Sequence, residues 1–276
     1  MNRIDRRFAE LRARGDKALV CFLTSGDPDF ATTADLAVEI ARSGADIVEL
    51  GVPFSDPLAD GPSIQASSFR ALERGATVRG VLDNVREIRA RCDTPIVLMT
   101  YYNPVLKYGL DGFARDAADA GADGVIMTDL PPEEAGEWKK SADRAGVATI
   151  FLLAPTSTKE RIEVAAKMGS GFIYCVSRTG VTGARDDMPA ELEALVATIK
   201  AATALPVVVG FGISKPEHVR FVTRFADGAV VGSALVNVIA DHAGSAESVG
   251  KFVKSLKAGV VRREQQGCIP KSSSQN

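Results

Sequence analysis

ARSGADIVEL (residues 41–50) contains the unit that decides the fold: a helix end, a glycine and then a short apolar run. The same unit recurs in ADAGADGVIM (118–127), DRAGVATIFL (143–152) and AKMGSGFIYC (166–175). A glycine just past a helix takes the left-handed conformation and caps the last carbonyl groups. The run after it is too short for a helix and, because it is apolar on both faces, is typical of a buried parallel strand. The repeat therefore predicts helices that alternate with buried parallel strands.

Eight such apolar runs are spaced along the chain. They are ALVCFLT (18–24), DIVELGV (46–52), PIVLMTY (95–101), DGVIMT (123–128), VATIFLL (147–153), GFIYCV (171–176), PVVVGFG (206–212) and DGAVVG (227–232). Amphipathic helical segments lie between them, for example 78–91 and 190–202. Their apolar faces are Val81, Leu82, Val85 and Ile88 in the first and Leu192, Leu195, Val196 and Ile199 in the second. Eight units of roughly 30 residues each predict a closed (β/α)8 TIM barrel.

An open, doubly wound sheet is the alternative architecture. Such a sheet usually has fewer strands and carries a phosphate-binding loop after its first strand. SGDPD (25–29), which follows the first run, lacks the GxGxxG pattern. An extra helix is predicted before the first strand, at 4–14, and the polar segment at about 262–276 is expected to be a frayed tail. We therefore expect residues 1–276 to form a single barrel domain with an extra N-terminal helix.

The overall composition excludes several classes of protein. Hydrophobic residues make up 46% of the 276 residues and charged residues 25%, as is ordinary for a globular protein with a full core. The net charge of −2 offers no basic surface for nucleic acid or a membrane. There is no signal-like start and no apolar run near the roughly 20 residues that span a bilayer. Four well-separated cysteines and two histidines favour free thiols in the cytoplasm and no metal centre.

Glu49 is the first candidate catalytic residue. The active site of a barrel lies in the loops that follow the carboxyl ends of its strands, and Glu49 lies near that end of the second run. A carboxylate in an apolar strand is costly unless it faces a cavity. Burial would raise its pKa, which suits a general acid–base near neutral pH. The alternative is a structural carboxylate paired with a buried basic group.

The loop GVPFSDPLADGPSIQ (51–65) follows the strand of Glu49 and contains three prolines together with Asp56 and Asp60. Prolines restrict the backbone, so the loop can hold a carboxylate in place without regular structure. Long loops in compact domains are usually functional or disordered, and this loop is too rich in proline and apolar residues for disorder. Asp60 could equally be the N-cap of a helix that begins at Pro62.

Two strand ends that contain glycine predict a phosphate site. In TIM barrels this site usually lies in the loops after the seventh and eighth strands, at the N-terminus of a short helix. Here those strands end in GFGIS (210–214) and VGSAL (231–235). Gly212, Gly232 and Ser233 would present backbone N–H groups to an anion without a large side chain in the way. Structural glycines alone would explain either turn, but the presence of both at the expected strand ends favours phosphate binding.

The loop after the sixth strand, SRTGVTGARDDMP (177–189), is interpreted as a mobile lid with glycine hinges. A disordered connector is the alternative. Tyr174, at the inner end of the sixth strand, is close enough to reach a substrate, although a core tyrosine is equally compatible with the sequence.

Taken together, these motifs resemble the α subunit of tryptophan synthase. The resemblance rests on the loop 51–65, LPPEE (130–134), SRTGVTGAR (177–185), GFGIS and VGSAL, in that order and spacing, and covers about 4–256. The loop 51–65 is highly specific, whereas many phosphate-binding barrels share the glycines. The resemblance implies a lyase of tryptophan biosynthesis that splits indole-3-glycerol phosphate into indole and glyceraldehyde 3-phosphate by a retro-aldol reaction.

The resemblance also assigns roles to residues. Glu49 and Asp60 match the two catalytic carboxylates of the family, and Tyr174 matches its active-site tyrosine. The positions expected to bind substrate are Phe22, Ile64, Thr182, Gly183, Phe211, Gly212, Gly232 and Ser233. Among them, Phe22 is expected to contact the indole and Thr182 to close over Asp60.

A partner is implied as well. The family resemblance implies an α2β2 complex with the tryptophan synthase β subunit, which receives indole through a tunnel and carries pyridoxal phosphate. No cofactor is expected in this chain. We expect the partner surface to include the loop 51–65, Asn103–Pro104 and the LPPEE segment.

Three other functions stay open on the sequence alone. Another phosphate-binding barrel enzyme would share the glycines but lack the SDPLADGP motif. A non-catalytic subunit that binds ligand and activates a partner would be expected to lack one of the two carboxylates. A free-standing indole-releasing lyase would have no β partner.

Overall fold

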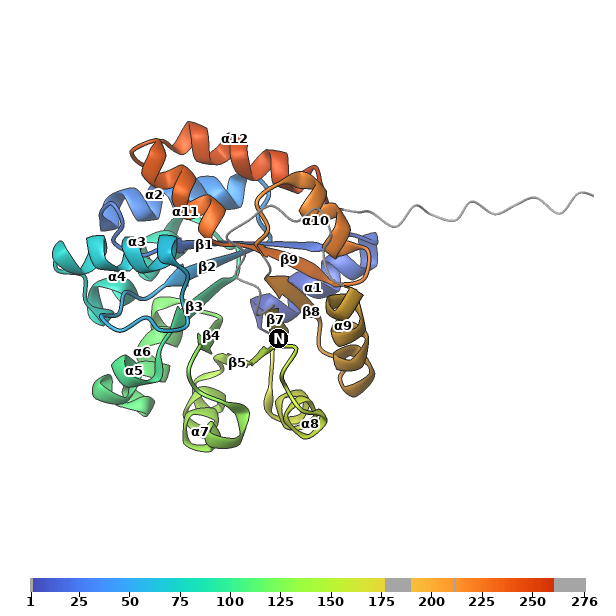
Figure 1. Cartoon of the computed structure of the whole chain (residues 1–276). Helices are drawn as coiled ribbons and strands as arrows, with labels where there is room; N and C mark the ends of the chain where they lie inside the picture. Colours follow the sequence, from blue (N-terminus) through green and yellow to red (C-terminus); the bar gives the residue numbers. More distant parts are fainter. Residues whose placement is uncertain (1, 177–189, 211, 261–276) are drawn as a thin grey trace, which may run out of the picture.

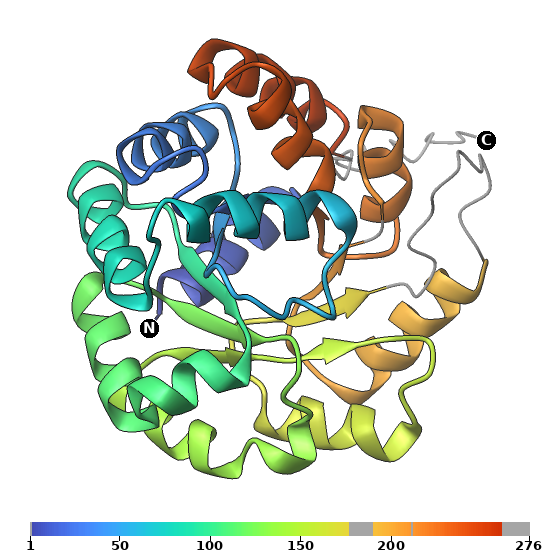
Figure 2. The same ribbon diagram turned by 60° about the vertical axis from the view of Figure 1, so that its left-hand side comes forward.

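The computed structural model describes residues 2–176, 190–210 and 212–260. In this part of the chain, parallel strands form a barrel with helices around its outside, as Figures 1 and 2 show. The strands are β1 (Ala18–Thr24), β2 (Ile47–Gly51), β3 (Ile96–Thr100), β4 (Gly124–Met127), β5 (Ala148–Ile150), β6 (Leu152–Leu153), β7 (Ile173–Val176), β8 (Val207–Gly210) and β9 (Gly228–Val231).

Helices surround the barrel, and the first of them covers its amino-terminal end. They are α1 (Arg3–Arg14), α2 (Phe30–Arg42), α3 (Pro62–Glu73), α4 (Val78–Arg91), α5 (Tyr102–Tyr108), α6 (Leu110–Ala120), the short 3-10 helix η1 (Pro132–Glu134), α7 (Gly136–Ala145), α8 (Lys159–Met168), α9 (Ala190–Ala202), α10 (Pro216–Thr223), α11 (Ser233–Asp241) and α12 (Ala246–Lys257). No helix within the described ranges is long and apolar enough to cross a lipid bilayer.

The order of the hydrogen-bonded strands shows how the barrel closes. The order is β5-β4-β3-β2-β1-β9-β8-β7-β6, and every pairing is parallel. The two strands at the ends of this order, β5 and β6, are consecutive in the chain and are separated by Phe151 alone. β5 pairs with β4 and β6 pairs with β7, so this stretch changes neighbour at Phe151 and completes the ring. The predicted (β/α)8 TIM barrel is confirmed, with the fifth predicted strand divided where it changes neighbour.

Alternate residues of each strand face the barrel interior. Val20, Ile47 and Val97 belong to an apolar cluster inside the barrel, together with residues of α1. Their chain neighbours Leu19 and Val48 belong to a second cluster, which the strands share with the surrounding helices. Both faces of the strands are therefore buried, which explains why they are continuous apolar runs in the sequence.

α1 fills the amino-terminal end of the barrel. Its residues Ile4, Phe8 and Leu11 are at most 6% exposed. Two glycines leave room for Ile4: a Cβ atom on Gly124 would lie 3.0 Å from Ile4 Cδ1, and one on Gly171 would lie 3.4 Å from Ile4 Cγ2. The predicted N-terminal helix is confirmed. Its Ile4 side chain fills the interior space that side chains on Gly124 and Gly171 would otherwise occupy.

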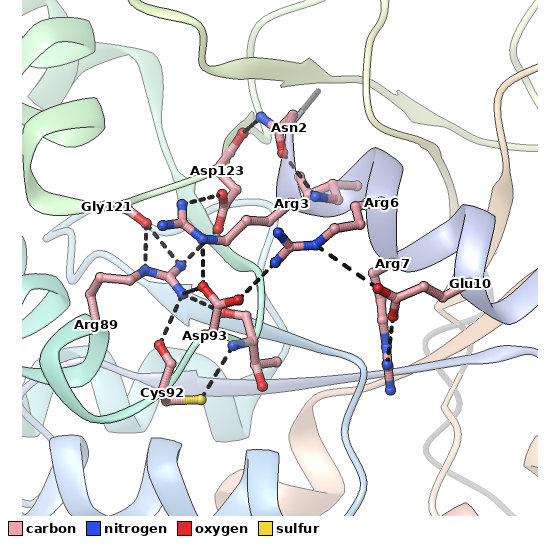
Figure 3. Close-up of polar contacts among 12 residues, drawn as sticks. Asn2, Arg3, Arg6, Arg7, Glu10, Arg89, Cys92, Asp93, Gly121 and Asp123 are labelled. Atoms are coloured by element: carbon pink, nitrogen blue, oxygen red, sulfur yellow. Dashed lines mark hydrogen bonds and ion pairs between the residues drawn. The ribbon is translucent and has the colours of Figure 1, made fainter.

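Polar contacts hold α1 against the barrel (Figure 3). Asp123, which is buried just before β4, accepts hydrogen bonds from Arg89 Nη2 at 2.8 Å and Arg3 Nη1 at 3.1 Å. Its carboxylate also accepts a hydrogen bond from the backbone N–H of Ile96 at 2.9 Å. Asn2 Nδ2 donates to the backbone carbonyl of Asp123 at 2.7 Å. A buried carboxylate is stable when it is both paired and hydrogen-bonded, and this one meets both conditions.

A left-handed glycine is predicted just past the helix in each of the four recurring units, and the structure has one in three of them. Gly121 and Gly146 cap their helices in the left-handed conformation, and Gly44 has a φ of +114° one residue beyond the cap of α2. The prediction is wrong for Gly169, which is extended with a φ of −70°. A Cβ atom there would lie 2.7 Å from the carbonyl oxygen of Ala165, so this glycine permits close approach to α8 rather than a left-handed cap.

Candidate active site

Glu49 lies inside the barrel, on β2, at the carboxyl end predicted from the sequence. It pairs in register with Phe22 of β1 and Val97 of β3, and it is 1% exposed. Within the described part of the chain, neither carboxylate oxygen has a hydrogen-bond partner. The alternative role of a structural carboxylate paired with a buried base is therefore not supported.

The environment of Glu49 keeps its carboxyl group protonated at neutral pH. Burial raises its pKa to about 8, and the negative charge of Asp60 raises it further in the same direction. Burial acts this way because the charged form loses its hydration without gaining a partner. At pH 7 the group therefore holds a proton that it can donate, and its conjugate base can accept one back.

Asp60 lies on the loop after β2 and has a different acidity. Burial raises its pKa to about 6, while a hydrogen bond from the Tyr101 hydroxyl acts in the opposite direction. At pH 7 Asp60 is mostly ionised, whereas Glu49 is mostly neutral. Two carboxyl groups whose environments separate their pKa values in this way are suited to different tasks in one reaction.

Tyr101 is a residue of this site that was not predicted from the sequence. It is 5% exposed, and its ring packs against Phe54 with centroids 5.1 Å apart. Its hydroxyl accepts a hydrogen bond from the backbone N–H of Ala59 at 3.0 Å, which places it against the residue before Asp60. Burial raises the pKa of Tyr101 to about 12. Its position just after β3 was the available signal, because the carboxyl ends of neighbouring strands meet at the same end of a barrel.

The structure also tests the alternative role of Asp60 as the N-cap of α3. The N-cap of α3 is Gly61, with no side-chain cap, and Pro62 occupies the first turn. The Asp60 backbone carbonyl accepts a hydrogen bond from Gln65 Nε2 at 2.8 Å, and its N–H donates to the carbonyl of Pro57 at 3.0 Å. Asp60 is therefore not the N-cap, and the loop holds its backbone without using its carboxylate.

Phe22 and Tyr174 form part of the wall around the carboxyl groups. Phe22 is 2% exposed and lies against Gly51, where a Cβ atom would be 2.6 Å from the ring. Tyr174 lies in the same way over Gly210. Burial raises the pKa of Tyr174 well above its usual value, and the charge of Glu49 is the next cause. Tyr174, which is half-buried, therefore lies close enough to Glu49 for the charge of the carboxylate to affect its hydroxyl.

Two of the predicted phosphate residues, Gly232 and Ser233, lie beside the loop 51–65. A Cβ atom on Gly232 would be 3.7 Å from Ile64 Cδ1 and 3.8 Å from Phe22 Cβ. A Cβ atom on Gly61 would be 3.9 Å from Ser233 Oγ. The phosphate end and the carboxylate end of the predicted site therefore meet.

The first turn of α11 is suited to an anion. α11 begins at Ser233, has Gly232 as its N-cap without a side-chain cap, and carries no acidic residue in its first turn. The first N–H groups of a helix have no partner within it, and the helix dipole favours negative charge there. Gly212 has a φ of +48° and open space where a side chain would lie. These features are compatible with an anion held by backbone N–H groups.

Three predicted substrate-binding residues, Thr182, Gly183 and Phe211, lie outside the described residues. Where the chain is described, no group of three histidine, cysteine or acidic residues could hold a metal ion. Cys21, Cys92 and Cys175 are free thiols.

The fold and these groups together define a class: a TIM barrel with two carboxyl groups of raised pKa and a helix N-terminus suited to an anion, at the carboxyl side of its strands. The chain belongs to the tryptophan synthase alpha chain family, whose model matches residues 8–263. The family identified from the sequence is confirmed. With it, the lyase class and the α reaction in tryptophan biosynthesis are confirmed, and another type of phosphate-binding barrel or a non-catalytic subunit is not favoured.

Similar proteins cover nearly the whole chain. The tryptophan synthase alpha chain of Geobacter sp. (strain M21) is 53% identical over 264 residues, which are 95% of this chain and 99% of the relative. That of Citrifermentans bemidjiense is 54% identical with the same coverage. The crystal structure of tryptophan synthase subunit alpha from Legionella pneumophila strain Paris is 40% identical, with a TM-score of 0.88 over 94% of this chain and 98% of that one. Tryptophan synthase from M. tuberculosis, in its aminoacrylate-bound form, gives 36% identity and a TM-score of 0.86 over 95% and 100%.

Removal of the Tyr101 hydroxyl provides a test of the electrostatics. In Tyr101→Phe, Asp60 loses the hydrogen bond that stabilises its ionised form, so its pKa is expected to rise above about 6. The Ala59 N–H also loses its acceptor, which is expected to cost about 1 kcal/mol of folding stability. Carboxyl ¹³C NMR titration of both proteins, with Asp60→Asn to assign the signal, measures the change. An unchanged or lower pKa in the variant would contradict the assigned role of Tyr101.

Proposed function

We propose that this chain cleaves indole-3-glycerol phosphate with Glu49 as the acid–base group and Asp60 as the electrostatic group. The observation that carries the proposal is the buried carboxyl of Glu49, which has no hydrogen-bond partner among the described residues and a pKa of about 8, close to an Asp60 whose pKa is about 6. Membership of the tryptophan synthase alpha chain family supports the choice of substrate.

The reaction needs one proton delivered and one removed. Neutral Glu49 donates its proton to C3 of the indole ring, and the ring nitrogen then carries positive charge. The ionised carboxylate of Asp60 stabilises that charge. The Glu49 carboxylate next accepts the proton of the adjacent glycerol hydroxyl, the carbon–carbon bond breaks, and its electron pair returns to the ring. Indole and glyceraldehyde 3-phosphate result, and Glu49 recovers its proton.

The remaining predicted residues bind and orient the substrate. Backbone N–H groups at Gly212, Gly232 and Ser233 hold the phosphate, helped by the N-terminal end of α11. Phe22 and Ile64 provide apolar contacts for the indole ring, and their positions next to Gly232 support this arrangement. Tyr174 lines the same space as a further active-site residue. Thr182, Gly183 and Phe211 keep their predicted roles as substrate-binding residues.

The proposal also includes a protein partner. We expect the chain to bind the tryptophan synthase β subunit in an α2β2 complex, with pyridoxal phosphate on that partner. Exposed apolar side chains support a partner surface beside the site: Leu58, on the loop that carries Asp60, is 92% exposed, and Leu106 of α5 is 53% exposed. A partner that covers Leu58 would contact the loop that positions Asp60. The free thiols of the described cysteines support a reducing, cytoplasmic setting.

Glu49→Gln tests the catalytic assignment. The amide keeps the size of the side chain but cannot donate and accept the proton, so cleavage is expected to fall by about 10²–10⁴-fold. Binding of a non-cleavable indole-alkyl phosphate, measured by calorimetry, is expected to stay within about threefold, since the phosphate contacts are elsewhere.

Indole release, measured by chromatography with synthetic indole-3-glycerol phosphate, provides the rate. Wild-type-like cleavage by Glu49→Gln would remove Glu49 from the mechanism. A wild-type chain that releases no indole, alone or with a β subunit, would contradict the proposed reaction itself.

The partner is tested by adding the β subunit of one of the relatives. Indole release by this chain is expected to rise at least tenfold, because the partner completes the geometry of the loop 51–65. Leu58→Ser is expected to weaken the complex at least tenfold in analytical ultracentrifugation, because the buried apolar area is lost. A turnover that does not change on adding the β subunit would refute activation by the partner.

A further inference from the structure

The helix that follows Asp60 is held by two polar contacts further along its length. α3 begins two residues after Asp60 and packs against the segment that follows β1. Ser67 Oγ lies 2.6 Å from Thr24 Oγ1, and both side chains are buried. Arg70 donates two hydrogen bonds to Asp27, from Nε to Oδ1 at 2.9 Å and from Nη2 to Oδ2 at 2.6 Å. Paired hydrogen bonds of this kind fix orientation as well as distance.

Asp27 lies on a segment that is itself tied to the strand of Glu49. The backbone N–H of Ser25 donates to the carbonyl of Gly51 at 2.9 Å, and Gly51 lies two residues after Glu49 on β2. The Ser25 hydroxyl donates to Asn84 Oδ1 of α4 at 3.1 Å. Asp27 itself is only 5% exposed, so it cannot move without disturbing its surroundings. The segment is therefore a fixed support for any helix bound to it.

A second route thus connects the two carboxyl groups, besides the loop between them. It runs from β2 through Gly51 to Ser25, then to Asp27, across the ion pair to Arg70, and back along α3 to Asp60. The loop 51–60 contains no helix or strand beyond Gly51, so its own hydrogen bonds fix it less than a helix would. A rigid helix seated at one end sets the position of the residues at its other end.

We propose that the Arg70–Asp27 ion pair is a positioning contact that seats α3 and thereby places Asp60 and Ile64 relative to Glu49. Arg70 is eight residues along α3, which at 1.5 Å per residue places it roughly 12 Å from the start of the helix. It therefore acts through the helix and not by touching the substrate. This inference rests on the proposed cleavage reaction for its kinetic consequence, but its structural consequence is independent of that reaction.

A matched ion pair at the other end of the barrel serves as the control. Arg89 bonds to the buried carboxylate of Asp123 at 2.8 Å, and Arg89 is more buried than Arg70. That pair ties α4 to the amino-terminal side of the barrel, away from the loop 51–65. Loss of either pair destabilises the fold, but only loss of the Arg70 pair is expected to disturb Asp60.

The experiment compares Arg70→Gln, Arg70→Lys and Arg89→Gln with the wild type, each at a temperature where circular dichroism shows it folded. Arg74 Nη1 lies 3.9 Å from Asp27 and leaves a cation near this carboxylate in the Arg70 variants. Amide hydrogen exchange is measured for the peptide covering 59–66, and kcat and KM are measured with indole-3-glycerol phosphate.

In Arg70→Gln, exchange in 59–66 is expected to accelerate at least tenfold, and kcat is expected to fall at least tenfold with KM changed less than threefold, since the proposed phosphate contacts lie after β8 and at the start of α11. Arg70→Lys, which keeps the charge but not the two-pronged geometry, is expected to be intermediate. Arg89→Gln is expected to leave both quantities within twofold of the wild type.

Unchanged exchange in 59–66 in Arg70→Gln, or equal acceleration in Arg89→Gln, would overturn the inference. Accelerated exchange in Arg70→Gln alone, in a protein whose wild type releases no indole, would uphold the positioning role and reject the proposed reaction.

Discussion

The burial of one carboxyl group, which has no hydrogen-bond partner in the part of the chain that the structure describes, is the constraint on which the site depends. Glu49 points into a barrel whose interior contains a cluster of apolar side chains, and α1 closes the amino-terminal end of that interior. An ionised carboxylate in such a place would be very costly, so the group holds its proton to an unusually high pH. The protonated carboxyl group of Glu49 thus lies next to the carboxyl ends of the strands. In our proposal, the loops at this end bind the substrate beside it.

Buried carboxyl groups are paired at the amino-terminal end of the barrel, whereas Glu49 at the carboxyl end has no partner in the part of the chain that the structure describes. At the amino-terminal end, Asp46 and Asp123 are each bonded to basic side chains and to a backbone N–H group. Full pairing makes them part of the framework, and it leaves them no capacity for chemistry. At the carboxyl end, Glu49 lacks such partners among the described residues, while the Tyr101 hydroxyl favours the ionised form of Asp60. The division follows the general rule for barrels that stability resides at the amino-terminal face and catalysis at the other.

Much of this arrangement could be predicted from the sequence because it follows from local patterns. The apolar runs located the strands, and the position of Glu49 in one of them predicts where the site lies. The interruption at Phe151 could not be predicted, since it depends on a change of neighbour in the closed barrel. The conformation of Gly169 depends on its distance from the carbonyl group of Ala165 and also escaped prediction.

Contacts between distant residues set the limit of prediction for the site. Tyr101 acts on Asp60 across 41 positions of chain, and Arg70 meets Asp27 across 43. Neither pairing has a local signature, because each is created by the order in which strands and helices surround the barrel. Sequence patterns predict the two carboxyl groups, while the structure adds the Tyr101 hydroxyl that lowers the pKa of Asp60 and the Arg70–Asp27 contact that we propose positions it.

The protonation state of Glu49 in the resting protein is the most direct measure of this account. Carboxyl ¹³C NMR of the wild type, with Glu49→Gln to assign the signal, follows it between pH 4 and pH 10. A midpoint near 8 is the result expected from burial without a partner. A midpoint near 4.5, the ordinary value for glutamate, would mean that the carboxyl is solvated or paired and would contradict the central claim.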